Sequence, residues 1–222
     1  MSNDIFIITE HIDGKFSDVS FELVGKAKEL ATALGGQAVA VALGSEVSAN
    51  VFASDSTIYV DDTNLAQFNP EAYGKVVEAL VKEKSPRLVM FGWTATGMDL
   101  AAWLSARIGK PCAAYVKGMS VDGGALVVNC QIYGGKMMAD VAPEGDMAIL
   151  AVLAGSFPVE AGQGSTAATQ IASPVSLDGL KIKFVEAIKP AAGDVDITAQ
   201  QKLVSIGRGI GSKENVELAE EL

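Results

Sequence analysis

The sequence is poor in the residues that build metal and catalytic sites. Its 222 residues include one histidine, His11, and two cysteines, Cys112 and Cys130. A zinc-type centre needs several histidines or cysteines at close spacing, and the chain has no such group. Both cysteines stand in apolar, strand-like runs, so we expect buried, reduced thiols. The sequence therefore predicts no metal site.

Basic side chains are outnumbered by acidic ones. The chain has 17 lysines and arginines against 27 aspartates and glutamates, and its formal net charge is −10. Such a surface is repelled by nucleic acid and by anionic lipid, which argues against both partners. Long apolar runs are also missing. The run at Ile5–Ile8 is too short for a signal peptide or a membrane span, so we expect a cytoplasmic protein without membrane insertion.

Aromatic residues are scarce, at 6% of the chain, whereas 49% of the residues are hydrophobic. Small apolar residues suit layered folds, because they allow helices to pack close to a sheet. Apolar β-branched runs alternate with helical patterns as far as Gly109, which is typical of a mostly parallel sheet. The expected strands are 5–8, 38–43, 57–60 and 88–91, and the expected helices start near Asp18, after Pro70 and before Leu100. The sequence predicts an α/β, Rossmann-like sheet with helices on both faces.

The pattern changes after residue 111. Between Cys112 and Ala154 the apolar runs shorten and are separated by glycine-rich turn clusters, which favours hairpins and an antiparallel extension of the sheet. Residues 162–176 lack periodicity and are interpreted as a connecting loop. One more strand is expected at 182–188.

The end of the chain is expected to belong to a second domain. We place the first domain at residues 1–190, and a linker with the first β-α segment of a truncated domain at 191–222. A short strand is expected at Leu203–Ile206, and a helix from Ser212 to Leu222. A single β-α unit cannot bury its own faces, and a helix of this length is marginal alone.

No catalytic set emerges from the residues. A triad needs a base close to a nucleophile, and His11 has no nucleophile motif beside it. The carboxylates Asp140, Glu144 and Asp146 are interpreted as solvated turn residues rather than an acid–base pair. A small hydrolase built on His11 is kept as a rival reading, although we expect no enzyme.

Two segments look like ligand sites. Residues 91–100 end a strand and open a helix, so their amides could hold a phosphate, whereas capping of the helix by Thr96 or a nearby hydroxyl is the simpler explanation. The segment Gly207-Arg208-Gly209 precedes another helical pattern. Its glycines allow a ligand to approach the backbone, and the planar guanidinium of Arg208 suits a pyrophosphate or a flavin edge.

Several of these segments together resemble the α subunit of electron transfer flavoproteins, the FixB family. Residues 8–16, with Glu10-His11 and Gly14-Lys15, are similar to the end of the family's first strand. Thr96–Ala101 and Tyr133–Lys136 are similar to a strand-to-helix segment and a hairpin. The sharpest similarity lies at Val204–Ser212, which resembles the entry into the family's flavin domain.

The resemblance implies an electron carrier rather than an enzyme. In the family, an α and a β subunit form a heterodimer that moves electrons from dehydrogenases to a quinone-linked or other acceptor. The first domain of the α subunit is expected to be a scaffold that binds the partner, and FAD binds in the second domain. The resemblance places an FAD contact at Arg208, with Gly207 and Gly209, in the full-length subunit. We expect FAD to be absent from this fragment. The alternative is an α/β module that binds AMP or ATP.

Overall fold

The computed structural model describes residues 2–188, 197, 200 and 202–221. The chain divides into two units, Met1–Phe184 and Val185–Leu222.

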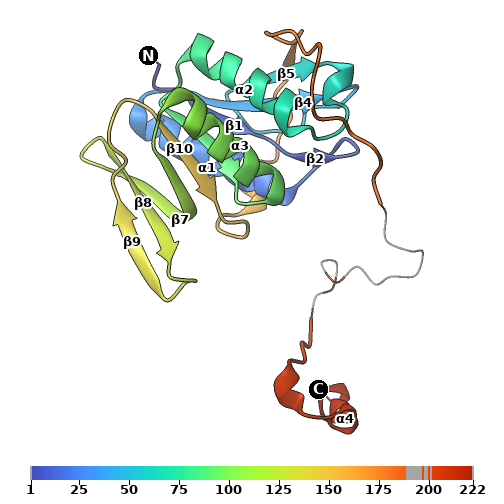
Figure 1. The fold of residues 1–222 in the computed structure, drawn as a ribbon. Helices are drawn as coiled ribbons and strands as arrows, with labels where there is room; N and C mark the ends of the chain where they lie inside the picture. Colours follow the sequence, from blue (N-terminus) through green and yellow to red (C-terminus); the bar gives the residue numbers. More distant parts are fainter. Residues whose placement is uncertain (1, 189–196, 198–199, 201, 222) are drawn as a thin grey trace. The chain divides into compact units, whose positions relative to one another are not determined.

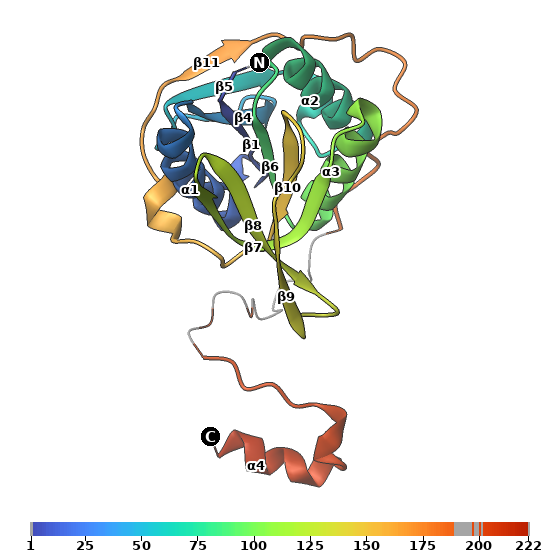
Figure 2. The same ribbon diagram turned by 90° about the vertical axis from the view of Figure 1, so that its left-hand side faces the viewer.

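The described part of the first unit is built on a nine-stranded sheet in the order β11-β5-β4-β1-β6-β10-β7-β8-β9 (Figure 1 and Figure 2). All neighbours from β11 to β7 pair in parallel, whereas β8 and β9 are antiparallel to their neighbours. The bounds are β1 (Ile5–Ile8), β4 (Ala38–Gly44), β5 (Ser56–Asp61), β6 (Leu88–Gly92), β7 (Cys112–Asp122), β8 (Ala125–Ile132), β9 (Met137–Val141), β10 (Ala148–Val152) and β11 (Ala168–Ile171).

Three long helices cover the sheet: α1 (Asp18–Leu34), α2 (Pro70–Lys84) and α3 (Ala95–Ile108). α1 packs on one face, and α2 and α3 pack on the other (Figure 2). The ends of these helices are determined by capping residues next to them in sequence. Asn69 accepts hydrogen bonds from the first amides of α2, while Gly35 and Gly109 end α1 and α3 with left-handed φ of 68° and 64°.

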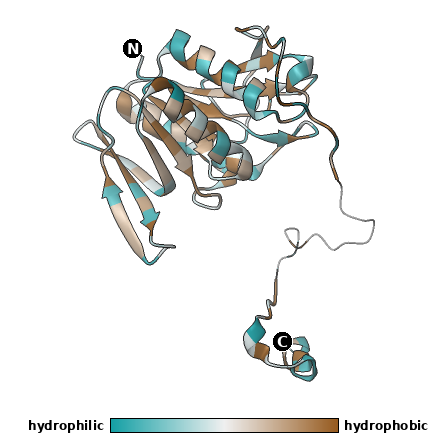
Figure 3. Cartoon of the chain, viewed as in Figure 1, coloured by the Kyte–Doolittle hydropathy of each residue, from teal (hydrophilic) through white to brown (hydrophobic). Residues whose placement is uncertain are grey.

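The core consists of two layers separated by the sheet. Along β1, Ile5 and Ile7 face the α1 layer, and Phe6 and Ile8 face the layer of α2 and α3. A parallel strand with helices on both faces is buried on both sides, which explains its unbroken apolar run. The hydropathy view shows the same apolar character along the central strands (Figure 3). The predicted fold class is confirmed.

Short elements complete the first unit. A small hairpin joins β2 (His11–Ile12) to β3 (Lys15–Phe16). The 3₁₀ helix η1 (Thr63–Leu65) follows β5, and η2 (Val159–Gly162) follows β10 and packs on α1.

Four details of the first unit differ from expectation. Residues 162–176 contain a strand, β11, which pairs with β5 at the edge of the sheet. The last apolar run of the 112–154 region is β10, which lies between β6 and β7 as a parallel strand. No strand is found at 182–188, although all of these residues are described. Cys130 is buried as expected, but Cys112, at the start of β7, is exposed.

The second unit contains short helices in its described residues: η4 (Arg208–Ile210), η5 (Lys213–Val216) and α4 (Glu217–Glu220). The strand expected at Leu203–Ile206 is absent, and the expected helix after Ser212 is a 3₁₀ turn followed by one α-helical turn. The expected end of that helix at Leu222 and the boundary expected at residue 190 lie outside the described residues.

Candidate functional site

The sheet has a switch point between β1 and β6. From β1 the chain passes through α1 to β4 on one side, and from β6 it passes through α3 to β7 on the other. Open parallel sheets bind ligands where the carboxyl ends of two such strands diverge. In this chain the residues at that point are Glu10, after β1, and Trp93 and Thr94, after β6.

The carboxyl group of Glu10 fills the space at the start of α3. The Thr94 hydroxyl is bonded to both carboxyl oxygens, at 2.9 and 2.8 Å, and its Oγ accepts the Gly97 N–H at 2.9 Å. A Cβ atom at Gly97 would lie 2.9 Å from Glu10 Oε1, and one at Gly92 would lie 3.0 Å from it. A Cβ atom at Gly97 would also lie 2.0 Å from the Gly92 carbonyl oxygen, so this backbone approach itself requires glycine. Both glycines also leave space for the Glu10 side chain.

The main chain of Glu10 is bound to the start of α1. Its carbonyl oxygen accepts the Ser17 N–H at 3.0 Å, and its N–H donates to Ser20 Oγ at 2.8 Å. Glu10 thus joins the first turns of two helices. Burial raises the pKa of its carboxyl group to about 7, and the hydrogen bond from Thr94 opposes part of that rise.

The positions of Glu10 and Thr94 argue against the nucleotide-binding alternative. A phosphate at the start of α3 would need free amides and room beside them. Instead, Thr94 caps the helix, and the Glu10 carboxyl group occupies the adjacent space. The capping explanation of residues 91–100 is therefore confirmed, with Thr94 as the cap.

His11 has both ring nitrogens engaged. Its Nε2 lies 2.8 Å from the Leu43 carbonyl oxygen, and its Nδ1 accepts the Gly14 N–H at 3.3 Å. Since a carbonyl oxygen only accepts, the ring proton lies on Nε2. The imidazole also packs edge-on against Phe16 at 5.5 Å between centroids. Neither nitrogen is left to act as a base, so the residue fastens the β2–β3 hairpin to the end of β4.

Asp140 and Asp146, interpreted above as solvated turn residues, have separate partners. Asp140 accepts a hydrogen bond from Asn129 across the β8–β9 pair, at 2.8 Å. Asp146 forms an ion pair with Lys110, which lowers the pKa of its carboxyl group. Within the residues that the structure describes, no three histidine, cysteine or acidic side chains gather in a group that could hold a metal ion.

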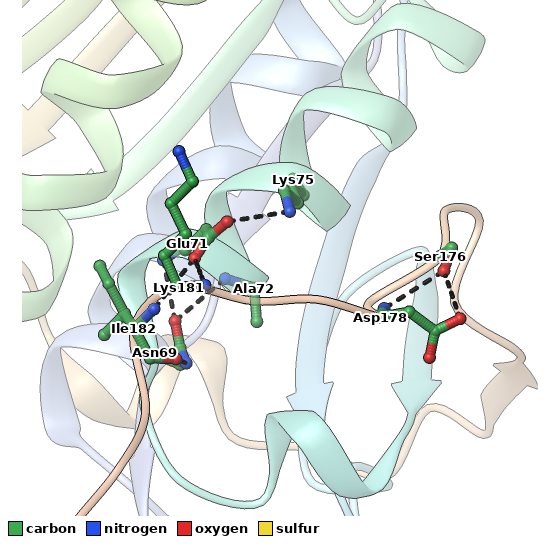
Figure 4. A network of polar contacts seen from close by, with 8 residues as sticks. All are labelled: Asn69, Glu71, Ala72, Lys75, Ser176, Asp178, Lys181 and Ile182. Atoms are coloured by element: carbon green, nitrogen blue, oxygen red, sulfur yellow. Dashed lines mark hydrogen bonds and ion pairs between the residues drawn. The ribbon is translucent and has the colours of Figure 1, made fainter.

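A polar clamp fastens the end of the first unit to α2 (Figure 4). Glu71 Oε2 accepts the backbone N–H groups of Lys181 and Ile182, at 2.7 and 3.2 Å, and Asn69 Nδ2 donates to the Ile182 carbonyl oxygen at 2.8 Å. Lys75 pairs with Glu71 at 3.0 Å, and these contacts, the Lys75 bond foremost, lower the pKa of the Glu71 carboxyl group. A cavity of about 650 Å³ lies beside this clamp, lined by residues of 63–69 and 177–184.

Large apolar side chains are exposed on α3 and on the antiparallel strands, and we call this set of residues the extension surface. Its adjacent residues Met137 and Met138 on β9 point to opposite faces of the sheet. Tyr115 is 47% exposed, has a left-handed φ of 53°, and packs on Trp93 at 4.4 Å between ring centroids. The β7 register shifts after Val116, and such bulges redirect side chains. The other large exposed apolar residues of this surface are Met98, Ile132, Tyr133, Met137, Met138 and Val141.

A groove of about 400 Å³ runs beside Trp93, between α3 and the start of β7. It is lined mainly by alanines of α3 with Met98 and Cys112. Sequence reasoning did not find this surface. The sequence signal was the pair of adjacent methionines in β9 together with the tyrosine in the turn before them. A hairpin exposed on both faces should alternate polar and apolar residues, and these three residues break that alternation.

The predicted cofactor residues lie in the second unit. Arg208 opens η4 and is exposed, with Gly207 and Gly209 on either side of it. The Ile210 N–H donates to the Gly207 carbonyl oxygen at 3.1 Å, so the segment forms a turn of its own. The proposed role of these three residues stays a prediction.

Comparison with known proteins agrees with the resemblance. Residues 5–176 match the family of the electron transfer flavoprotein domain. The chain is 31% identical to the electron transfer flavoprotein α subunit of Clostridium acetobutylicum and 30% identical to protein FixB of Clostridium saccharobutylicum, covering 98% of this chain and 68% of each relative. It is 26% identical to the acryloyl-CoA reductase electron transfer subunit beta of Anaerotignum propionicum, over 99% of this chain and 70% of that relative. The chain belongs to the electron transfer flavoprotein family and is an α-subunit domain of the FixB type.

Proposed function

We propose that the first unit is the scaffold on which an electron transfer flavoprotein β subunit docks, and that it performs no redox chemistry itself. The observation that carries this proposal is the extension surface. Its exposed aromatic and methionine side chains are the residue types enriched in the cores of protein interfaces. The relatives are named as subunits, which supports a partner chain.

The electron-carrying cofactor of the assembled protein is FAD under this proposal. The second unit supplies Arg208 and the amides of its flanking glycines, which fit a pyrophosphate or the polar edge of a flavin. When bound, FAD supplies the electron chemistry, and the protein contributes position and electrostatics. The complete carrier would accept electrons from a dehydrogenase and pass them to a quinone-linked or other acceptor, in the cytoplasm. No described helix has the length and apolar character to cross a membrane.

The docking role is tested with a double variant, Tyr133→Ser with Met137→Ser. Both side chains are exposed, at 76% and 55%, so their loss should leave the fold intact. We expect binding of the β subunit, measured by calorimetry, to weaken roughly tenfold or more. The matched control is Ile12→Ser, an 81% exposed apolar residue on the β2–β3 hairpin. Unchanged affinity in the double variant, with an unchanged circular dichroism spectrum, would remove the extension surface from the interface.

A further inference from the structure

The loop after β10 presents three consecutive backbone amides to one carboxylate. Gly155 N–H donates to Glu22 Oε1 at 2.9 Å, and the N–H groups of Ser156 and Phe157 donate to Glu22 Oε2 at 2.9 and 3.2 Å. Glu22 lies on α1 and is only 3% exposed. The segment that follows the loop, drawn in amber, runs beside α1 in Figure 2. A buried carboxylate is thus held entirely by main-chain donors from another element.

Successive amides that converge on one point form an anion-binding concavity, or nest. The left-handed φ of 75° at Gly155 supplies the local turn that such a concavity needs. The loop also contains a polar atom without a hydrogen-bond partner in the described residues, the buried Ser156 Oγ. Lys26 Nζ lies 5.5 Å from the centroid of the Phe157 ring, and it is ion-paired with Glu29 at 2.7 Å. These features suit an oxyanion with more acceptor atoms than one carboxylate offers.

The shape of the loop is held by contacts other than Glu22. At its start, Leu153 N–H donates to the Val116 carbonyl oxygen at 2.8 Å. At its end, Gly162 packs against the Phe21 backbone, and Gly25 of α1 packs against Ala161, where a Cβ atom would lie 2.7 Å from the alanine's own Cβ. We therefore expect both ends of the loop to keep their places when the carboxylate is removed.

We propose that residues 155–157 form an oxyanion-binding nest and that Glu22 is its built-in ligand. The nest accepts phosphate or a small carboxylate once the Glu22 carboxylate is removed. It follows the carboxyl end of β10, on the same side of the parallel sheet as the switch point between β1 and β6. In the native chain Glu22 keeps this position closed and ties the β10 loop to α1. The proposal is independent of the β subunit and of FAD.

The test is Glu22→Ala, titrated with inorganic phosphate at constant ionic strength. The variant should be less stable than the parent, and phosphate should raise its Tm by about 3–5 °C at a tenfold excess over Kd, with a further logarithmic rise at higher concentration. The amide resonances of Gly155, Ser156 and Phe157 should shift saturably, and their midpoint gives the Kd. Formate should act in the same way, because it replaces the missing carboxylate. The parent chain and Glu83→Ala, which removes an exposed glutamate from α2, should show no saturable change.

A folded Glu22→Ala protein whose three amides do not respond to either anion would overturn the proposal and leave Glu22 a structural residue only. If the alanine variant is unfolded in buffer, recovery of the folded circular dichroism signal on adding phosphate or formate supports the nest. If Glu22→Ala stays unfolded at saturating anion while Glu22→Gln folds, the result counts against the proposal. The fold then requires the side chain at position 22 rather than a bound anion.

Discussion

The hydroxyl group of Thr94 lies within hydrogen-bonding distance of both carboxyl oxygens of Glu10, although 84 positions separate the two residues in sequence. The contact closes the gap between the ends of β1 and β6, and it places a carboxyl group of raised pKa at the switch point of the sheet.

Replacing Glu10 by glutamine should change how stability depends on pH. The pKa of this carboxyl group is about 7 in the folded state and 4.5 in the unfolded reference, so the folded state binds more protons between these values. Stability contributed by this group is therefore present below pH 4.5 and is lost as the pH rises through 7. The Glu10→Gln variant should lack this decline and be more stable than the parent at pH 8 by about 1–3 kcal/mol.

Urea unfolding between pH 4.5 and 8 measures this difference, with Glu29→Gln as an exposed control on α1. Parallel pH profiles for the parent and Glu10→Gln would show that Glu10 is not the titrating group.

A single methyl group at Gly74 should destabilise the protein. An added Cβ atom would lie 2.8 Å from two ring atoms of Trp103, so α2 and α3 would be forced apart. Helix propensity alone favours Gly74→Ala by about 1 kcal/mol, whereas overpacking costs about 1–3 kcal/mol. The sign of the change in unfolding free energy decides between the two effects. A stabilised variant would refute the packing argument, and Trp103→Ala should make the substitution favourable.

Loss of the Glu71 carboxylate should loosen the end of the first unit. Glu71→Ala removes the acceptor of the Lys181 and Ile182 amides, so the local free energy of opening falls. Trypsin should then cleave after Lys181 and Lys183 several times faster than in the parent, as followed by mass spectrometry. Glu83→Ala serves as the control on the same helix. Equal cleavage rates in all three proteins would mean that other contacts hold this segment.

Arg208 is predicted to contact FAD in the complete α subunit assembled with its β subunit. A charge-assisted hydrogen bond is worth about 1.5–3 kcal/mol, so Arg208→Ala should weaken FAD binding roughly tenfold to a hundredfold or shift the flavin potential. Lysine should restore only part of the effect, because it lacks the planar fork. Flavin and redox titrations of both variants measure this. Unaltered affinity and potential in the alanine variant would assign Arg208 to the solvated surface.

The helices were predictable from sequence because their signals are local. Asn69 and Pro70 start α2, and Gly35 and Gly109 end α1 and α3, within one turn of the residues they affect. The placement of β10 and β11 was not predictable. A short apolar run fits any open sheet edge equally well, and the choice of partner depends on strands that are distant in sequence.

The same distinction between local signals and long-range contacts applies to the candidate site. Glu10 and Thr94 each stand at a recognisable strand end, but their contact exists only because β1 and β6 are neighbours. Glu22 carried no signal, since a glutamate in an amphipathic helix is ordinarily solvent-facing. The methionines of β9 and Tyr133 did signal the extension surface, whereas the β7 bulge beside it has no sequence signature here.

β10 is synthesised after β7, β8 and β9, although it lies between β6 and β7 in the sheet. This order has a consequence for folding during synthesis. Val152 pairs with Gly92, and the whole of β7, β8 and β9 is made between them. Until Ala148–Val152 has left the ribosome, β6 has an apolar edge without a partner, and β7 has nothing to attach it to the sheet. Such an edge is a template for pairing with other chains. A nascent chain paused near residue 145 should therefore be the stage at which this protein most needs a chaperone.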